Sequence, residues 1–268
     1  MIWLLGGTLS LVIALLSYRF RFLSFGGAVL AFFMGWVIFS LGRLPFSIPI
    51  LVFFISSSLL SKVGRIEKME LSSLAEKSSR RDFGQVLANG VLPSLSLVIW
   101  YQFKKPFWCL LYLVALASAS ADTWATEIGV LSNSLPRNIL NFKKVQRGAS
   151  GAVSFLGMSA ALAGALIIGI SALYAFRSES IISLGWRHIL FLTIIGFIAQ
   201  TSDSLLGAST QGQYLCVKCG QITERNIHCS GFRTKLISGW KWINNDVVNF
   251  LSSLSGVLLG WIILELLF

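Results

Sequence analysis

Apolar residues run through the chain in long blocks separated by short polar segments. Eight blocks approach the roughly 17–25 residues of a membrane-spanning helix; the first and third are short, so seven spans remain possible. The predicted spans are Ile2–Ser17, Phe22–Leu41, Phe46–Ser61, Gln85–Tyr101, Phe107–Ile128, Gly151–Phe176, His188–Thr210 and Val247–Phe268. This pattern predicts an all-α, polytopic transmembrane bundle that forms a single integral membrane domain over residues 1–268.

Composition supports the same class. Hydrophobic residues make up 55% of the 268 residues and charged residues only 12%, whereas soluble domains have about 25% charged residues. The net charge of +11 would suit a nucleic-acid-binding protein, but the basic residues are scattered among short loops. We therefore predict no nucleic-acid partner and assign these residues to topology and to contact with anionic membrane lipids.

The basic residues also predict an orientation. Alternate loops hold 17 Lys and Arg residues, against 5 in the loops between them. By the positive-inside rule the richer loops face the cytoplasm. The prediction is a multi-pass protein of the cell membrane, with both termini outside if there are eight spans.

Acidic residues inside predicted membrane helices are costly and indicate function by default. Near the cytoplasmic end of the fifth span, four polar residues fall within an arc of about 140° on a helix: Asp122, Thr123, Thr126 and Glu127. The seventh span carries Gln200, Asp203 and Ser204, and the eighth begins with Asn245, Asp246 and Asn249. These oxygen-rich groups suit Mg²⁺ held together with substrate phosphates; the alternatives are a buried hydrogen-bond cluster and, for Asp246, a helix cap.

Two basic segments on the same predicted face could hold phosphate. One leads into the sixth span, where glycines and a helix N-terminus favour an anion, and contains Lys144, Arg147, Gly148, Gly151 and Ser154. The other leads into the fourth span with Arg80, Arg81, Gln85 and Asn89; guanidinium groups bind phosphate through paired hydrogen bonds. Either segment could instead be a simple topology determinant, but the acidic groups on the same face favour phosphate binding for the segment that leads into the sixth span.

The loop over residues 213–240 is expected to carry a small zinc knuckle. Cys216 and Cys219 have the Cys-x2-Cys spacing of zinc ligands, and His228 and Cys229 follow. Because disulfides are disfavoured in the predicted cytoplasmic location, structural zinc is the main hypothesis. A dithiol redox pair and fortuitous thiols are the alternatives, and the fourth ligand stays open because His228 and Cys229 are adjacent.

Five motifs of this chain resemble those of a known family. They are Arg-Arg-Asp-x-x-Gln-Val-x-Ala-Asn-Gly, Ala-Asp-Thr-Trp-Ala-Thr-Glu-Ile-Gly, Arg-Gly-x-x-Gly-x-Val-Ser, Ser-Asp-Ser-Leu-Leu-Gly-Ala and Asn-Asn-Asp-x-Val-Asn. Their order is similar to that in the membrane family called domain of unknown function 92, which includes the plant phytyl-phosphate kinase of tocopherol synthesis and an animal transmembrane protein.

The resemblance implies a prenyl-phosphate kinase. Such an enzyme transfers a phosphoryl group from a nucleoside triphosphate, CTP or ATP, to an isoprenyl monophosphate such as phytyl or geranylgeranyl phosphate. Mg²⁺ is then assigned to Asp122, Glu127, Asp203 and Asp246, and phosphate binding to Arg81, Lys144 and Arg147. A CTP-dependent polyprenol kinase, a cytidylyltransferase, and a transporter of phosphorylated lipids or ions remain alternatives.

Overall fold

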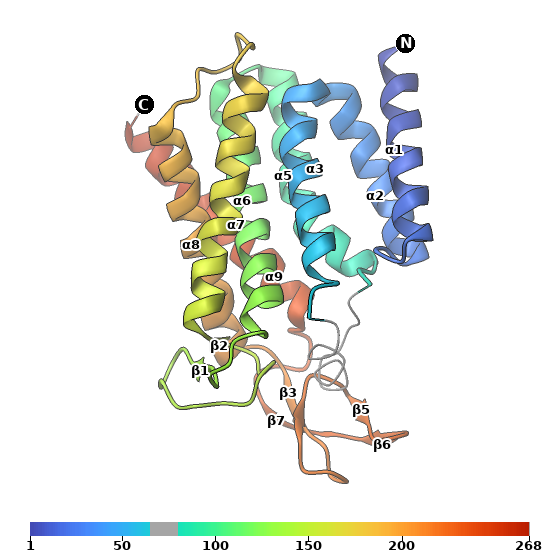
Figure 1. The fold of residues 1–268 in the computed structure, drawn as a ribbon, viewed down its shortest axis with the longest axis vertical. Coiled ribbons are helices and arrows are strands. Elements are labelled where there is room, and N and C mark those ends of the chain that lie inside the picture. The colour runs from blue at the N-terminus through green and yellow to red at the C-terminus, as the bar shows by residue number, and fades with distance from the viewer. Residues whose placement is uncertain (65–79, 268) are drawn as a thin grey trace.

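The computed structural model describes residues 1–64 and 80–267. The transmembrane prediction is confirmed: the described residues form a helical bundle (Figure 1). Its helices are α1 (Ile2–Arg19), α2 (Phe25–Val37), α3 (Arg43–Leu60), α5 (Phe83–Phe103), α6 (Pro106–Gly129), α7 (Phe155–Phe176), α8 (Trp186–Ser209) and α9 (Asn245–Leu267). Most of the basic loop that follows α3 lies outside the described residues.

Within the described residues, seven helical stretches are long and apolar enough to cross a membrane, and one of them, Phe25–Leu60, has 36 residues. As a straight helix it would measure about 54 Å, well beyond a bilayer core. Instead the π-helical segment η1 (Ile38–Gly42) ends at Arg43, whose φ of 51° breaks the helix. The chain then turns back as α3 (Figure 1), so α2 and α3 form separate passes.

Helix α6 lies at the centre of the bundle. Every residue from Cys109 to Ala121 is buried, and α3, α5, α7, α8 and α9 all pack against this helix. Close approach depends on small residues, as is usual between membrane helices. The Ser120 hydroxyl donates to the Gly164 carbonyl at 2.6 Å, and a Cβ on Gly164 would lie only 2.7 Å from the Ser120 carbonyl oxygen.

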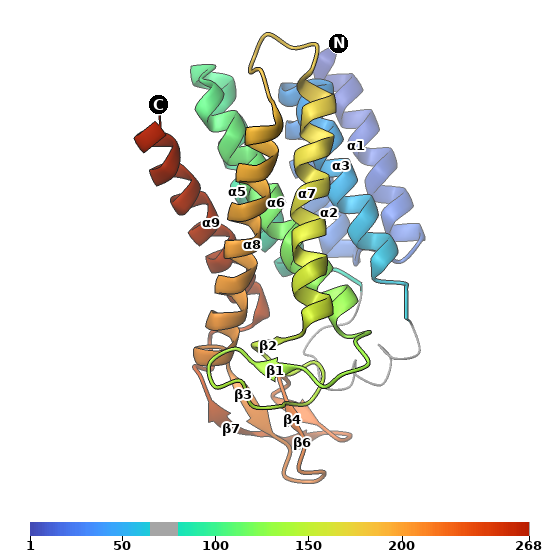
Figure 2. The same ribbon diagram turned by 60° about the vertical axis from the view of Figure 1, so that its left-hand side comes forward.

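Short antiparallel strands lie at the end of the bundle opposite both chain termini, which we call the strand end (Figure 2). β1 (Arg137–Asn138) pairs with β2 (Ala152–Val153), and β5 (Ile227–His228) with β6 (Phe232–Arg233). β3 (Gln213–Leu215) lies between β4 (Ile222–Thr223) and β7 (Lys235–Ser238).

The predicted start of the sixth span at Gly151 is wrong by four residues. Residues 152–153 are used in β2, and α7 begins at Phe155. Ser154 is the N-cap, since its hydroxyl accepts a hydrogen bond from the Gly157 N–H at 3.1 Å. The Gly151 segment is therefore a loop and strand that precede the helix, and it can cover the neighbouring helix ends.

Candidate active site

A cavity of about 150 Å³, which we call the polar pocket, lies at the strand end. Its walls come from the ends of α6 and α8, the start of α7, the start of α9 and the loop 147–154. Asp122, Asp203 and Arg147 are among its lining residues. The pocket thus combines carboxylates with a guanidinium group at the edge of an apolar bundle.

Asp122 and Asp203 meet in this pocket although they are 81 residues apart in sequence. Their carboxyl groups are hydrogen-bonded to each other, and Ser252 of α9 bonds to Asp203. With its amide oriented to match its neighbours, Asn249 donates to an Asp203 oxygen at 3.2 Å and to the Asn245 carbonyl at 2.9 Å. Two carboxyl groups this close must share a proton or a cation, and the surrounding oxygen donors fit a hard ion such as Mg²⁺.

The loop 147–154 lies directly on α8. Gly151 has a φ of 72°, and a Cβ there would be 2.3 Å from the Ala208 Cβ. On the α8 side Gly207 makes the same approach possible, since its own Cβ would lie 3.2 Å from the Gly151 nitrogen. The contact holds Arg147, which donates to the Asn133 carbonyl at 3.2 Å, and Gly148 along the wall of the pocket.

The structure brings ten of the predicted site residues into the lining of this one pocket. They are Asp122, Thr126, Arg147, Gly148, Gly151, Ser154, Gln200, Asp203, Ser204 and Asn245. Gln200 and Ser204 are buried and joined by a 3.0 Å hydrogen bond.

Other predicted residues lie elsewhere among the described part of the chain. Lys144 is exposed, and its backbone forms an isolated antiparallel β-bridge with that of Arg137. Arg80 donates through Nε to the Leu23 carbonyl at 2.6 Å. Asp246 is half-buried in the first turn of α9, where the cap is Asn244, whose Oδ1 accepts from the Val247 N–H at 3.2 Å. Thr123 and Glu127 on α6 are half-buried and lie outside the pocket lining.

Sequence reasoning missed Glu224, which enters the polar pocket from the loop after β4. One of its carboxylate oxygens accepts hydrogen bonds from Ser150 and from Gln211, each at 2.8 Å. A signal was present: Glu224 is the one acidic residue in the otherwise basic segment 213–240. The pocket therefore contains three carboxylates from three separate parts of the chain.

A second cavity of about 110 Å³, which we call the apolar cavity, lies between α1, α2, α3 and α5. Its walls are mostly aliphatic and aromatic, and Arg81, Gln85 and Asn89 contribute polar groups near the start of α5. Gln85 forms a capping box with Asp82, and Asn89 donates to the Gln85 carbonyl at 3.0 Å. Both amide side chains therefore make hydrogen bonds within the first turns of α5 and also line this cavity.

Arg81 is the charged group of the apolar cavity. Burial lowers the pKa of Arg81, and attraction to the Glu127 carboxylate opposes that shift. The guanidinium lies over the Phe53 ring at 5.7 Å. Within the described residues its buried Nη2 has no hydrogen-bond partner, an arrangement that is costly unless an anionic ligand supplies one.

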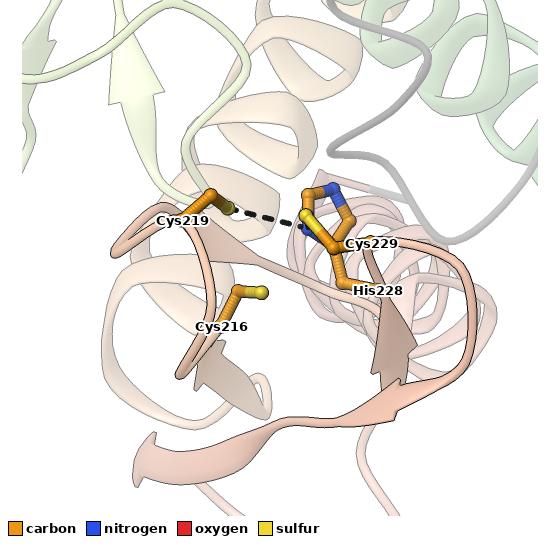
Figure 3. Close-up of side chains that lie close together, drawn as sticks. All are labelled: Cys216, Cys219, His228 and Cys229. Atoms are coloured by element: carbon orange, nitrogen blue, oxygen red, sulfur yellow. Dashed lines mark hydrogen bonds between the residues drawn. The ribbon is translucent and has the colours of Figure 1, made fainter.

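The four residues of the predicted knuckle converge, as Figure 3 shows. One ligand atom from each of Cys216, Cys219, His228 and Cys229 lies within 4.8 Å of all the others. The His228 Nδ1 is 3.5 Å from the Cys219 sulfur and 3.3 Å from the Cys229 sulfur. His228 and Cys229 are adjacent in sequence, yet both side chains reach the centre of the cluster, because Cys229 has a φ of 46° and the chain turns sharply there.

The fold and the polar pocket define a polytopic α-helical membrane protein with a carboxylate-rich site at one end of its bundle. The chain matches the family described as integral membrane protein DUF92 over residues 8–257. It belongs to this family.

Curated relatives cover most of its length. Protein PGR of Arabidopsis thaliana is 29% identical over 92% of this chain and 90% of its own. The uncharacterized membrane protein MJ0933 of Methanocaldococcus jannaschii is 33% identical over 74% of this chain and 78% of its own. The uncharacterized membrane protein sll0875 of Synechocystis is 25% identical over 77% of this chain and 69% of its own. No solved structure matches the chain significantly.

Proposed function

We propose that this protein is a membrane prenyl-phosphate kinase, which transfers a phosphoryl group from a nucleoside triphosphate to an isoprenyl monophosphate and forms the diphosphate. The observation that carries the proposal is the meeting of Asp122 and Asp203 opposite the Arg147–Gly148 loop. Phosphoryl transfer is catalysed mainly by positioning and charge neutralisation. A pocket with carboxylates on one side and a guanidinium on another supplies the groups for both.

The polar pocket fits the nucleotide phosphates and Mg²⁺. Asp122 and Asp203 would hold the ion, with Asn245 and Ser204 nearby as oxygen ligands. When bound, Mg²⁺ supplies neutralisation of the charge that develops on the phosphate oxygens. Arg147 would bind the triphosphate through its guanidinium group. By the distribution of basic residues this end of the bundle would face the cytoplasm, where nucleotides are available.

The apolar cavity would receive part of the isoprenyl chain of the acceptor. Its walls match a hydrocarbon tail, and the buried Arg81 Nη2 offers a hydrogen bond to the monophosphate. Glu127 lies on the same helix as Asp122 and attracts Arg81. Its predicted role as a Mg²⁺ ligand is replaced in this proposal by a role in holding Arg81.

The reaction requires little base catalysis. An acceptor phosphate oxygen, already ionised, forms a bond to the γ-phosphorus while the bond from that phosphorus to the β–γ bridging oxygen breaks, and the nucleoside diphosphate leaves. Neither histidine of the chain, His188 or His228, lines the polar pocket. A polyprenol kinase would also need a base for its alcohol acceptor, a role that one of the pocket carboxylates could take.

The test is phosphoryl transfer by the purified full-length protein in lipid nanodiscs. The assay supplies Mg²⁺, γ-labelled CTP or ATP, and phytyl or geranylgeranyl phosphate, and detects labelled diphosphate by chromatography. Asp122→Asn should lower the rate by at least on the order of 100-fold, because stabilisation through a bound metal amounts to several kcal/mol. Glu179→Gln is the matched control, since Glu179 is exposed in the loop between α7 and α8.

Absence of the diphosphate with every nucleotide and both acceptors, in a preparation that is folded and binds nucleotide, would refute the kinase proposal. Transfer to phytol or geranylgeraniol in place of the phosphates would favour the polyprenol kinase. Movement of label across a sealed vesicle without a new covalent bond would favour a transporter.

A further inference from the structure

The cysteine cluster and the polar pocket are connected through a single short loop. Cys219 precedes β4 and His228 ends β5, and Glu224 lies in the three-residue interval between these two strands. The segment between two ligands of the cluster, Cys219 and His228, therefore carries a carboxylate of the pocket.

The donor set of the cluster suits one particular ion. Three sulfurs and one imidazole nitrogen are a usual ligand set for structural zinc. Zinc–sulfur bonds of about 2.3 Å in a tetrahedron put sulfurs roughly 3.8 Å apart, and the four ligand atoms here all lie within 4.8 Å of one another.

The surrounding strands are too short to hold this arrangement by themselves. β4, β5 and β6 have two residues each, whereas isolated two-stranded pairs are marginal in water even when longer. Val217, Ile227 and Phe232 are exposed, so the segment buries little apolar surface. Metal binding contributes folding free energy directly in small units of this kind.

We propose that Cys216, Cys219, His228 and Cys229 bind a structural zinc ion and that this ion fixes Glu224 in the polar pocket as its third carboxylate. Ser150 and Gln211 complete the placement, because both donate to Glu224. Ser150 belongs to the loop that also carries Arg147 and Gly148, so Glu224 ties the cysteine segment to that loop. Glu224 is a positioning residue, because it accepts hydrogen bonds from Ser150 of the Arg147 loop and from Gln211 just after the end of α8.

The zinc half of the proposal is tested without any assay of activity. The full-length protein purified in detergent should contain one zinc per chain by plasma mass spectrometry, and Cys219→Ser should lose it. Cys109→Ala is the matched control, because Cys109 is a buried thiol of α6 outside the cluster. Limited trypsin digestion should cut after Arg225 much faster in Cys219→Ser, or after chelation, than in the zinc-loaded protein.

A wild-type protein without zinc would overturn the zinc half, as would an intact mass showing a disulfide within the cluster. Unchanged trypsin protection in Cys219→Ser would overturn the structural role of the ion.

The claim that Glu224 is positioned by the zinc ion rests on the proposed function, because it is tested by the rate of phosphoryl transfer. Glu224→Gln should keep its zinc and its trypsin protection but lower phosphoryl transfer by about tenfold, chiefly through a higher KM for nucleotide. Glu179→Gln again serves as the control. Wild-type kinetics in Glu224→Gln would overturn the positioning role.

The zinc and trypsin measurements do not depend on kinase activity, so they would stand even if the kinase proposal were refuted. Nucleotide affinity, measured by calorimetry, would then test the Glu224 half, and equal affinity in Glu224→Gln and wild type would overturn it.

Discussion

Substituting Gly151 with Ala tests whether the loop 147–154 must lie against α8. Gly151 has a φ of 72°, which costs an L-residue roughly 1–2 kcal/mol, and the new Cβ would be 2.3 Å from the Ala208 Cβ. Ordinary contact begins at 3.4 Å, so the loop must retreat from α8 by about 1 Å. Misplacement on this scale costs on the order of 100-fold in rate, and we expect a loss of that size.

The variant Gly220→Ala separates the backbone cost of a positive φ from the steric clash with α8. Gly220 has nearly the same φ, 70°, but a Cβ there meets nothing within 4 Å. Both variants place an alanine at a positive φ, which destabilises the folded protein, but only in Gly151→Ala does the new Cβ clash with a neighbour. Gly220 follows Cys219 directly, so the comparison uses Gly220→Ala protein that keeps its zinc. For that protein we expect a small loss in thermal stability similar to that of Gly151→Ala, and a large loss of phosphoryl transfer and nucleotide affinity in Gly151→Ala alone. Equal activity in the two variants would refute the argument that this loop forms the pocket wall.

Two further predictions concern charged groups of the two cavities. Asp122→Asn and Asp203→Asn should be strongly non-additive in phosphoryl transfer, with the double variant no slower than the worse single variant, because the two carboxyl groups act as one unit; additive losses would show that they act separately. Arg81→Lys should raise the KM for isoprenyl phosphate about tenfold without the same change for nucleotide, since lysine lacks the planar paired donors of arginine. Arg187→Lys is its control, because Arg187 also lies 5.7 Å from an aromatic ring but at the far end of the bundle.

The helices were predictable because they depend on local composition. Apolar length located every span to within a few residues, and it predicted two separate spans, Phe22–Leu41 and Phe46–Ser61, within the stretch that holds α2 and α3. The meeting of Asp122 and Asp203 was predictable in outline, since both lie near the same end of their helices. Their hydrogen bond needed the structure, because rotation of each helix about its axis depends on packing against several neighbours.

Loop residues were less accessible to sequence reasoning. Glu224 lies in a segment with no helical period, so nothing local says which way its side chain points. Lys144 and Arg80 were predicted from charge alone, and the structure uses them in loop pairing and in contact with the α1–α2 turn instead. Charge identifies groups that can bind phosphate, but only the folded loops decide which of them face a cavity.

Helical geometry explains why the predicted arc on α6 divides between two sites. Thr126 lies about 40° around the helix from Asp122, whereas Glu127 lies about 140° away. Only the closer pair lines the polar pocket, and Glu127 instead acts on Arg81 at the apolar cavity. A six-residue stretch of the central helix thus carries one acidic group that lines the polar pocket and a second that attracts Arg81 of the apolar cavity. A membrane phosphotransferase needs such an arrangement, since its water-soluble donor and its lipid acceptor must approach the same reacting atoms from different surroundings.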